Sequence, residues 1–382
     1  MRHLNGLLIS QFGPHAHLFS FCFHPILADL ALRFHTVGRK PWAEREPTTM
    51  TQTTTALPPL SAAWDPSLAT PDTDEFCWTP LQLAARAGDI AEMQRILAEN
   101  PAAANDPPCG YYGQTALQAA CMHGHEAAVR LLLDVGADVH FSGGNNFQRN
   151  ALQIACGNGD DRIVEMLLAA GARVNEVMSA SDGRAHKQPS SGPSSRIKVT
   201  RYNGRTALQA ACDRGHKHLA ERLLRLGADV NAPPSPTAGC TAIQAAARGG
   251  YLPIVELLLQ HGADANAAAA RHKGYTALQG ACRGGHADIV ERLLQLRAVD
   301  VDALGGMHGD GTALHAAAEG GNADVIRMLL ATGANINARS WKRGRGHTAL
   351  QSALAAGHDE AARVLRESGA TERLGGGYFL FS

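Results

Sequence analysis

Small and apolar residues recur along this chain at helical spacing, and the whole pattern repeats. A clear copy runs from Thr206 to Asn231. The run Ala-Leu-Gln-Ala-Ala-Cys follows Thr206 and ends before Gly215, and a leucine-rich run then ends before Gly227. The leucines of that run recur at helical spacing: Leu219, Leu223, Leu224 and Leu226. Glycine adopts positive φ without steric cost, so both glycines suit helix ends. The pattern predicts a first helix, a turn, a second helix and an extended finger.

The same sequence motif occurs eight times, beginning at Thr79, Thr115, Asn150, Thr206, Thr241, Thr276, Thr312 and Thr348. Successive starts lie 36, 35, 56, 35, 35, 36 and 36 residues apart. A fixed period in this range indicates a stack of repeats, in which each repeat buries its apolar face against its neighbours. An interior of Leu and Ala needs few large side chains, which fits an aromatic content of only 5%.

Each copy opens with a capping box. Its Thr or Asn is followed three residues later by Gln or His, so each side chain can bond an unpaired N–H at the helix start. The Gln or His residues of the eight capping boxes are Gln82, Gln118, Gln153, Gln209, Gln244, Gln279, His315 and Gln351. Pro80 suits the first helical position, where no N–H is needed.

The repeated motif T-A-L-Q-A-A…G-H…L-L…G-A-D-V-N closely resembles the ankyrin repeat, and the resemblance covers about residues 79 to 371. That family usually has His where seven of these copies have Gln, and Gln keeps the capping geometry. The resemblance implies an all-α ankyrin-repeat solenoid of about eight helix-turn-helix repeats with extended fingers. It also implies a concave face, made of fingers and first helices, that binds partner proteins.

Three segments lie outside the regular period. Residues 1–78 hold no repeat, and we expect a largely disordered leader without a membrane span, because His and Pro interrupt its apolar stretch. Residues 1–49 are open to three interpretations: a targeting peptide, an untargeted leader, or a mis-assigned start with translation beginning at Met50. Residues 176–205 are rich in Ser, Gly and Pro and predict a flexible insertion, either passive or regulatory. Residues 372–382 form an apolar tail, which either packs on the last repeat or docks a partner.

Two copies depart from the pattern at their second turn. The copy from Thr79 ends in Asn100-Pro101 instead of Gly-Ala-Asp, as expected of a terminal repeat. The copy from Thr276 has Arg297 in place of the turn glycine and one additional residue. Left-handed geometry costs a residue other than glycine about 1–2 kcal/mol, so we expect a re-routed turn there.

Four of the eight cysteines occupy one slot of the first helix: Cys121, Cys156, Cys212 and Cys282. Neighbouring helices in a stack lie about 8–10 Å apart, which exceeds the limit of about 7 Å between the Cα atoms of a disulfide. We therefore expect buried, reduced thiols. Reduced thiols indicate an intracellular compartment, cytoplasmic or nuclear.

The sequence offers no catalytic constellation. Four histidines follow the glycine between the two helices, one per copy, so they cannot converge on one metal ion and are assigned to local turn chemistry: His125, His216, His286 and His358. The glycine-rich strings at 305–311 and 344–346 follow no strand and have no Walker lysine. We therefore expect no enzyme, no cofactor and no metal site.

Function is expected on the fingers, which carry aromatic and basic residues. Lys and Arg exceed Asp and Glu by eight over the finger segments, in a chain whose net charge is zero. Tyr, Trp and Arg are enriched at binding hot spots. The candidate partner-binding residues are Tyr111, Tyr112, Phe147, Tyr202, Arg271, Lys273, Tyr275, Trp341, Lys342, Arg343 and Arg345.

These features predict a monomeric scaffold or adaptor that binds one or more proteins. Two alternatives stay open. One is nucleic-acid or phosphate-ligand binding through the basic fingers, against which stand the zero net charge and the acidic finger at Asp302 and Asp310. The other is a substrate-recruiting subunit of a larger enzyme complex.

Overall fold

The computed structural model describes residues 78–107, 113–141, 149–176, 205–235, 238–296, 298–306, 311–342 and 345–371. The expectations for the leader up to residue 77, for 177–204 of the insertion and for the apolar tail lie outside these residues.

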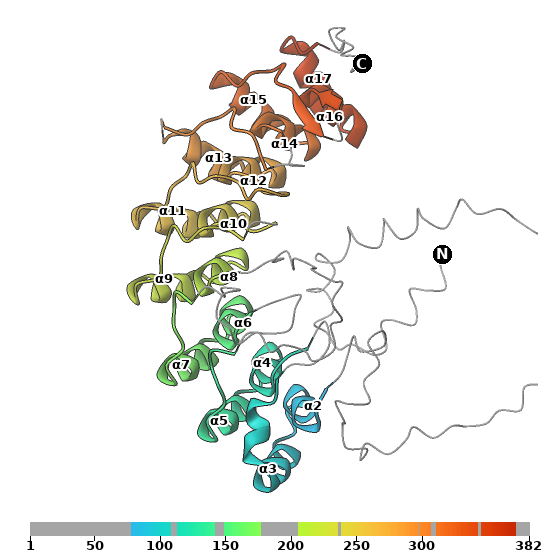
Figure 1. The fold of residues 1–382 in the computed structure, drawn as a ribbon. Helices are drawn as coiled ribbons and strands as arrows, with labels where there is room; N and C mark the ends of the chain where they lie inside the picture. Colours follow the sequence, from blue (N-terminus) through green and yellow to red (C-terminus); the bar gives the residue numbers. More distant parts are fainter. Residues whose placement is uncertain are drawn as a thin grey trace, which may run out of the picture. The chain divides into compact units, whose positions relative to one another are not determined.

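The described residues form eight helix pairs joined in sequence order. The first helices are α2 (Pro80–Ala87), α4 (Ala116–Met122), α6 (Ala151–Asn158), α8 (Ala207–Asp213), α10 (Ala242–Gly249), α12 (Ala277–Gly284), α14 (Ala313–Glu319) and α16 (Ala349–Ala356). The second helices are α3 (Ile90–Glu99), α5 (Glu126–Asp134), α7 (Asp161–Ala169), α9 (Lys217–Arg225), α11 (Leu252–Gln260), α13 (Ala287–Leu294), α15 (Ala323–Ala331) and α17 (Asp359–Glu367). Each first helix packs on the first helix of the next pair (Figure 1), which confirms the predicted stack.

The predicted capping box is present at the start of every first helix. In α8 the Thr206 N–H donates to Gln209 Oε1 at 3.0 Å, and the Gln209 N–H donates to Thr206 Oγ1 at 3.2 Å. The remaining polar atom of this glutamine has a further role, because Gln209 Nε2 donates to the Ala232 carbonyl at 2.9 Å. The first helices from α2 to α14 thus also hold the finger that follows their own repeat, as Gln244 does through the Ala267 carbonyl at 2.8 Å.

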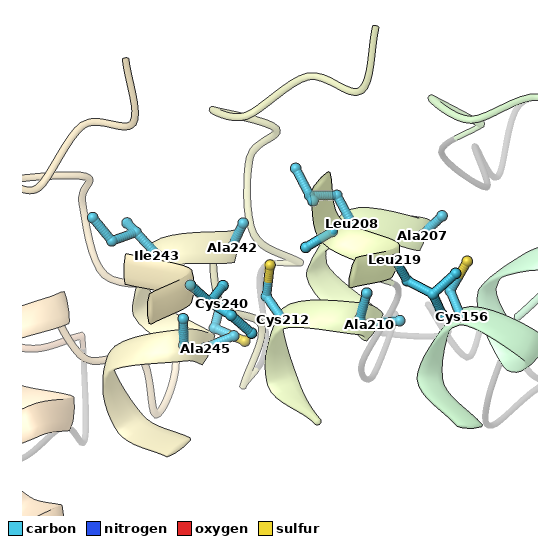
Figure 2. Close-up of a cluster of buried hydrophobic side chains, with 14 of the residues drawn as sticks. Cys156, Ala207, Leu208, Ala210, Cys212, Leu219, Cys240, Ala242, Ile243 and Ala245 are labelled. Atoms are coloured by element: carbon cyan, nitrogen blue, oxygen red, sulfur yellow. The ribbon is translucent and has the colours of Figure 1, made fainter. Parts of the chain in front are cut away.

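Small side chains fill the space between neighbouring first helices (Figure 2). Cys212 of α8 is buried facing Ala242 and Ala245 of α10, and Ala207 and Ala210 are buried on the other side of α8, toward Cys156 of α6. The second helices supply the larger core residues, such as Leu219, Ile254 and Leu258. The expected cysteine slot is buried, and the described cysteines are free thiols: Cys121, Cys156, Cys212, Cys240 and Cys282. Burial raises their pKa, for Cys156 to about 12, so these thiols stay protonated and unreactive.

One side chain at the start of most fingers links consecutive repeats. Asn231 Nδ2 donates to the Gly262 carbonyl at 3.0 Å, and its Oδ1 accepts the Asp264 N–H at 2.9 Å. Asn105 and Asn266 make the same pair of hydrogen bonds with the next repeat. Asn175 does so as well, to Gly227 at 2.8 Å and Asp229 at 2.8 Å. The stack is therefore continuous on both sides of the insertion.

Two turns depart from the regular pattern, and Arg297, where a re-routed turn is expected, lies outside the described residues. After α3 the chain forms a 3-10 helix, η2 (Pro101–Asn105), which brings Asn105 to the linking position. Helix α13 ends at Leu294, and Gln295 has φ −64° and ψ −22°, which is right-handed geometry. The Ala298 carbonyl then accepts from Asn266 Nδ2 at 2.6 Å, in the place that Gly262 takes one repeat earlier.

Candidate partner-binding face

The fingers between α9 and α14 are joined by backbone hydrogen bonds. The Ala238 N–H donates to the His272 carbonyl at 2.9 Å, and the Gly306 N–H donates to the Gly274 carbonyl at 3.0 Å. Close approach of the chain requires glycine at 274, since a Cβ there would lie 2.2 Å from the backbone nitrogen of Ala270. This finger exposes two of the predicted site residues, Arg271 and Lys273. Lys273 has a φ of 57°, a left-handed conformation that is uncommon outside glycine.

Tyr275 ends the same finger but packs against the helices instead of projecting from it. Its ring is half-buried on the core, and the Arg248 guanidinium lies 5.4 Å from the ring centroid. Its hydroxyl is buried and makes no hydrogen bond of normal geometry among the described residues, with the Cys240 thiol as a neighbour. Gly280 makes room for the ring, because a Cβ there would lie 3.1 Å from it. The structure therefore gives Tyr275 a role in packing and in orienting Arg248.

A two-stranded hairpin forms the finger before the last repeat. Strands β1 (Ser340–Lys342) and β2 (Arg345–His347) are antiparallel, and their register places Trp341 opposite Gly346 and Lys342 opposite Arg345. The side chains of Trp341, Lys342 and Arg345 are not among those described. The other predicted site residues lie outside the described residues: Tyr111, Tyr112, Phe147, Tyr202 and Arg343.

A row of charged side chains at the ends of the first helices was missed from the sequence. Asp213 lies between Arg205 Nη1 and Arg248 Nη2, and its Oδ1 is 2.6 Å from Arg248 Nη2. One repeat further on, Arg283 Nη2 lies 2.5 Å from Glu319 Oε2. Burial alone would raise the pKa of Asp213, but the positive charges of Arg205 and Arg248 hold it below its usual range. Asp213 is therefore a carboxylate at neutral pH.

The histidines between the helices act across repeats and not only within their own turn. His286 Nε2 lies 3.1 Å from the Arg248 carbonyl of the preceding first helix, and His216 makes the same contact with Gly157 at 3.2 Å. The ring of His216 also covers Gly159, where a Cβ would lie 2.5 Å from it. The assignment to local turn chemistry was thus too narrow, because the ring reaches the helix end of the repeat before.

Metal-binding clusters and membrane-spanning helices can both be searched for in the described part of the chain. No group of three or more His, Cys, Asp or Glu residues there could hold a metal ion. Nor is any described helix both long enough and apolar enough to cross a membrane.

A continuous stack of capped helix pairs linked through their turns defines an α-helical repeat protein. The family model described as ankyrin repeats (3 copies) matches residues 64–142, 81–178, 142–234, 190–269, 235–305, 267–340 and 302–373. The chain belongs to the ankyrin-repeat family.

Two similar proteins give the comparison further detail. The human tRNA endonuclease ANKZF1 is 39% identical over 103 residues, which are 25% of this chain and 13% of that protein. The chain thus matches only a small part of the length of this relative. The crystal structure of the human ASB11 ankyrin repeat domain is 27% identical, with a TM-score of 0.48, and the match covers 68% of this chain and 100% of that chain.

Proposed function

We propose that this chain is a scaffold or adaptor that binds partner proteins on the face formed by its first helices and fingers. Ankyrin repeats are generally protein-interaction modules, and their fold is typically non-catalytic. The proposal assigns no enzymatic step to the chain. Its mechanism is a preformed surface that a partner meets with little ordering cost.

The observation that supports the proposal is the contrast between buried and exposed positions of the repeat. The third residue of each first helix is Gln or His in every copy, and seven of these eight side chains are buried. The seventh residue is half-buried or exposed and changes from copy to copy: Arg86, Met122, Gly157, Asp213, Arg248, Arg283, Glu319 and Ala355. Stacking requires Gln or His at the third residue of the first helix. The seventh residue is not constrained in this way and can vary to suit a partner.

The test separates binding from stability. Trp341→Ala with Arg343→Ala changes the finger before the last repeat and no helix residue, so we expect the free energy of unfolding to change by no more than about 0.5 kcal/mol. A partner would be captured on the full chain, purified, and its dissociation constant measured by calorimetry with each variant. We expect the double variant to bind the partner more weakly while its melting curve stays unchanged.

The matched control is Leu258→Ala in α11. Leu258 is fully buried, so its truncation should cost about 2–5 kcal/mol of stability. Its binding should return to normal once the measurement is made well below its melting temperature. If the hairpin variant binds as tightly as the original chain, the finger is not part of the partner site.

A further inference from the structure

Two arginines stand at the same place in consecutive repeats, on the face proposed for partner binding. Arg248 is in the last turn of α10 and Arg283 in the last turn of α12, and these helices pack on one another. Their side chains are 44% and 43% exposed. Each pairs with a carboxylate of an adjacent repeat, Asp213 and Glu319 respectively.

The pairing leaves positive charge on the outside. The Asp213 side chain is only 9% exposed and Glu319 only 19%, so the carboxylates lie beneath and the guanidinium groups lie above. Asp213 also pairs with Arg205, whose side chain is 14% exposed, so one negative charge serves two positive ones. A guanidinium has five N–H donors, and the contact of Arg248 with Asp213 leaves several of them for another acceptor.

Arg248 is held in place by three features that occur together in this part of the stack. Asp213 fixes one edge of its guanidinium, and the Tyr275 ring lies against its face. The ring fits because the sixth repeat has Gly280, where other copies carry a larger residue such as Ala245 or Ala316. A pre-positioned guanidinium loses less side-chain freedom on binding than a free one does.

The neighbouring finger extends the same charge. Arg271 and Lys273 are exposed in the finger that ends at Tyr275. Together with Arg248 and Arg283 they give four exposed cations on two adjacent repeats. Such a surface attracts an anionic partner and repels a cationic one.

We propose that Arg248, Arg283, Arg271 and Lys273 form the docking site for an acidic segment of a partner protein, whose carboxylates bind the two guanidinium groups. The proposal rests on the proposed function and specifies the kind of segment that the face receives. Arginine suits this role because its planar fork binds a carboxylate through two parallel hydrogen bonds. Tyr275 and Gly280 act as positioning residues.

The probe is a fluorescein-labelled peptide that alternates glutamate with alanine, compared with its glutamine counterpart by fluorescence anisotropy on the full chain. We expect the glutamate peptide to bind and the glutamine peptide to bind at least about tenfold more weakly, since it lacks charge-assisted hydrogen bonds. Arg248→Gln with Arg283→Gln should weaken the glutamate peptide by a similar factor. Higher salt should weaken its binding to the original chain.

The matched control removes two arginines of the second helices, Arg222→Gln with Arg292→Gln. It takes away the same charge from α9 and α13, so peptide binding should stay within about twofold of the original chain. Tyr275→Phe keeps the ring and should bind the peptide normally, whereas Tyr275→Ala should bind it more weakly. Melting curves of all variants confirm that they are folded.

Two results with the peptide and oligonucleotide probes would overturn the proposal. One is equal binding of the glutamate peptide by the original chain and by the Arg248/Arg283 variant. The other is tighter binding of oligothymidylate than of the peptide, lost in the same variant, which would make the site one for nucleic acid. A captured partner that is sensitive to the hairpin variant but not to the Arg248/Arg283 variant would overturn the acidic-segment site and leave the scaffold function standing.

Discussion

His315 shows what one side chain must do at the start of a first helix. It is fully buried, its Nδ1 accepts the Thr312 N–H at 3.3 Å, and its Nε2–H donates to the His347 carbonyl at 3.0 Å. Only the neutral ring can accept at one nitrogen and donate at the other. Burial lowers the pKa of His315 below its usual 6.5. The other copies reach the same geometry with Gln, which carries no charge at any pH.

This difference predicts a pH-dependent stability that His315→Gln should reduce. The unfolded chain takes up a proton near pH 6.5, whereas the folded chain does so only at lower pH. Between these values the unfolded state binds more protons, so stability falls as the pH falls. The loss is about 1.4 kcal/mol for each unit by which the pKa is lowered. Urea unfolding at a series of pH values between neutrality and mild acid measures it.

The control for this prediction is His261→Gln, since His261 lies at the end of α11 and is exposed. This variant should keep the pH dependence of the original chain. An equal loss of stability in acid for the original chain and for His315→Gln would show that the buried ring does not titrate in this range.

At the scale of the element, a repeat is held together by the glutamine of its first helix. Gln244 accepts the Thr241 N–H at 3.0 Å and donates to the Ala267 and Ala268 carbonyls at 2.8 and 3.2 Å. The capping half of this network was predicted, because its two partners are three residues apart in the sequence. The finger half was not, because Ala267 is 23 residues away and meets Gln244 only in the folded repeat.

Replacing this glutamine should therefore cost more than an ordinary helix cap. Gln244→Leu removes the partner of the buried Thr241 N–H and of the part-buried Ala267 and Ala268 carbonyls, and a buried group left unpaired costs about 1–3 kcal/mol. We expect a loss of about 2–5 kcal/mol in the free energy of unfolding, measured with urea. Thr241→Ser keeps the capping hydroxyl and should change stability by less than about 0.5 kcal/mol. A loss no larger than that of a simple cap, about 1 kcal/mol, would mean that the finger carbonyls are satisfied in another way.

At the scale of the whole molecule, the insertion leaves the stack intact. Asn175 comes before it and bonds Gly227 and Asp229 after it, as Asn231 bonds the repeat that follows. Helices α6 and α8 pack on one another like other neighbouring first helices. The 21 additional residues are therefore not needed to join these two repeats.

Deleting residues 181–201 would restore the ordinary period between Asn150 and Thr206. Loop length enters stability only through a slowly varying closure entropy, about 0.6 kcal/mol for each doubling. The shortened chain should thus melt within a few degrees of the original, by circular dichroism. A large drop would show that the deleted residues pack on the helices, and any loss of partner binding without such a drop would place a contact in the insertion.

The features that could be predicted from the sequence are those that recur in every repeat or that involve residues close together along the chain. The period could be predicted because the same motif recurs, and the capping boxes and glycine turns such as Gly215 and Gly227 because each depends on residues a few positions apart. The pairing of Arg248 with Asp213 spans 35 residues, and that of Arg222 with Glu165 spans 57. Such pairs depend on the height and rotation of one repeat on the next, which no short-range pattern contains. Tyr275 was predicted as a surface residue for the same reason, since Gly280 makes room for it only after folding.

The asparagine side chains that link consecutive repeats also affect where the stack would separate. Asp302 takes the place of the linking asparagine after the sixth repeat and accepts the Asn335 N–H at 3.1 Å. A carboxylate has no proton to donate, so Asp302 lacks the bond to the turn carbonyl that Asn105, Asn175, Asn231 and Asn266 make. Under force or partial denaturation we expect this junction to open more readily than the four with a linking asparagine, which frees α14 to α17 as one block that carries the β1–β2 hairpin. A partner held by that hairpin would pull on the terminal block alone, while the arginine face on α10 and α12 stays in the part that remains folded.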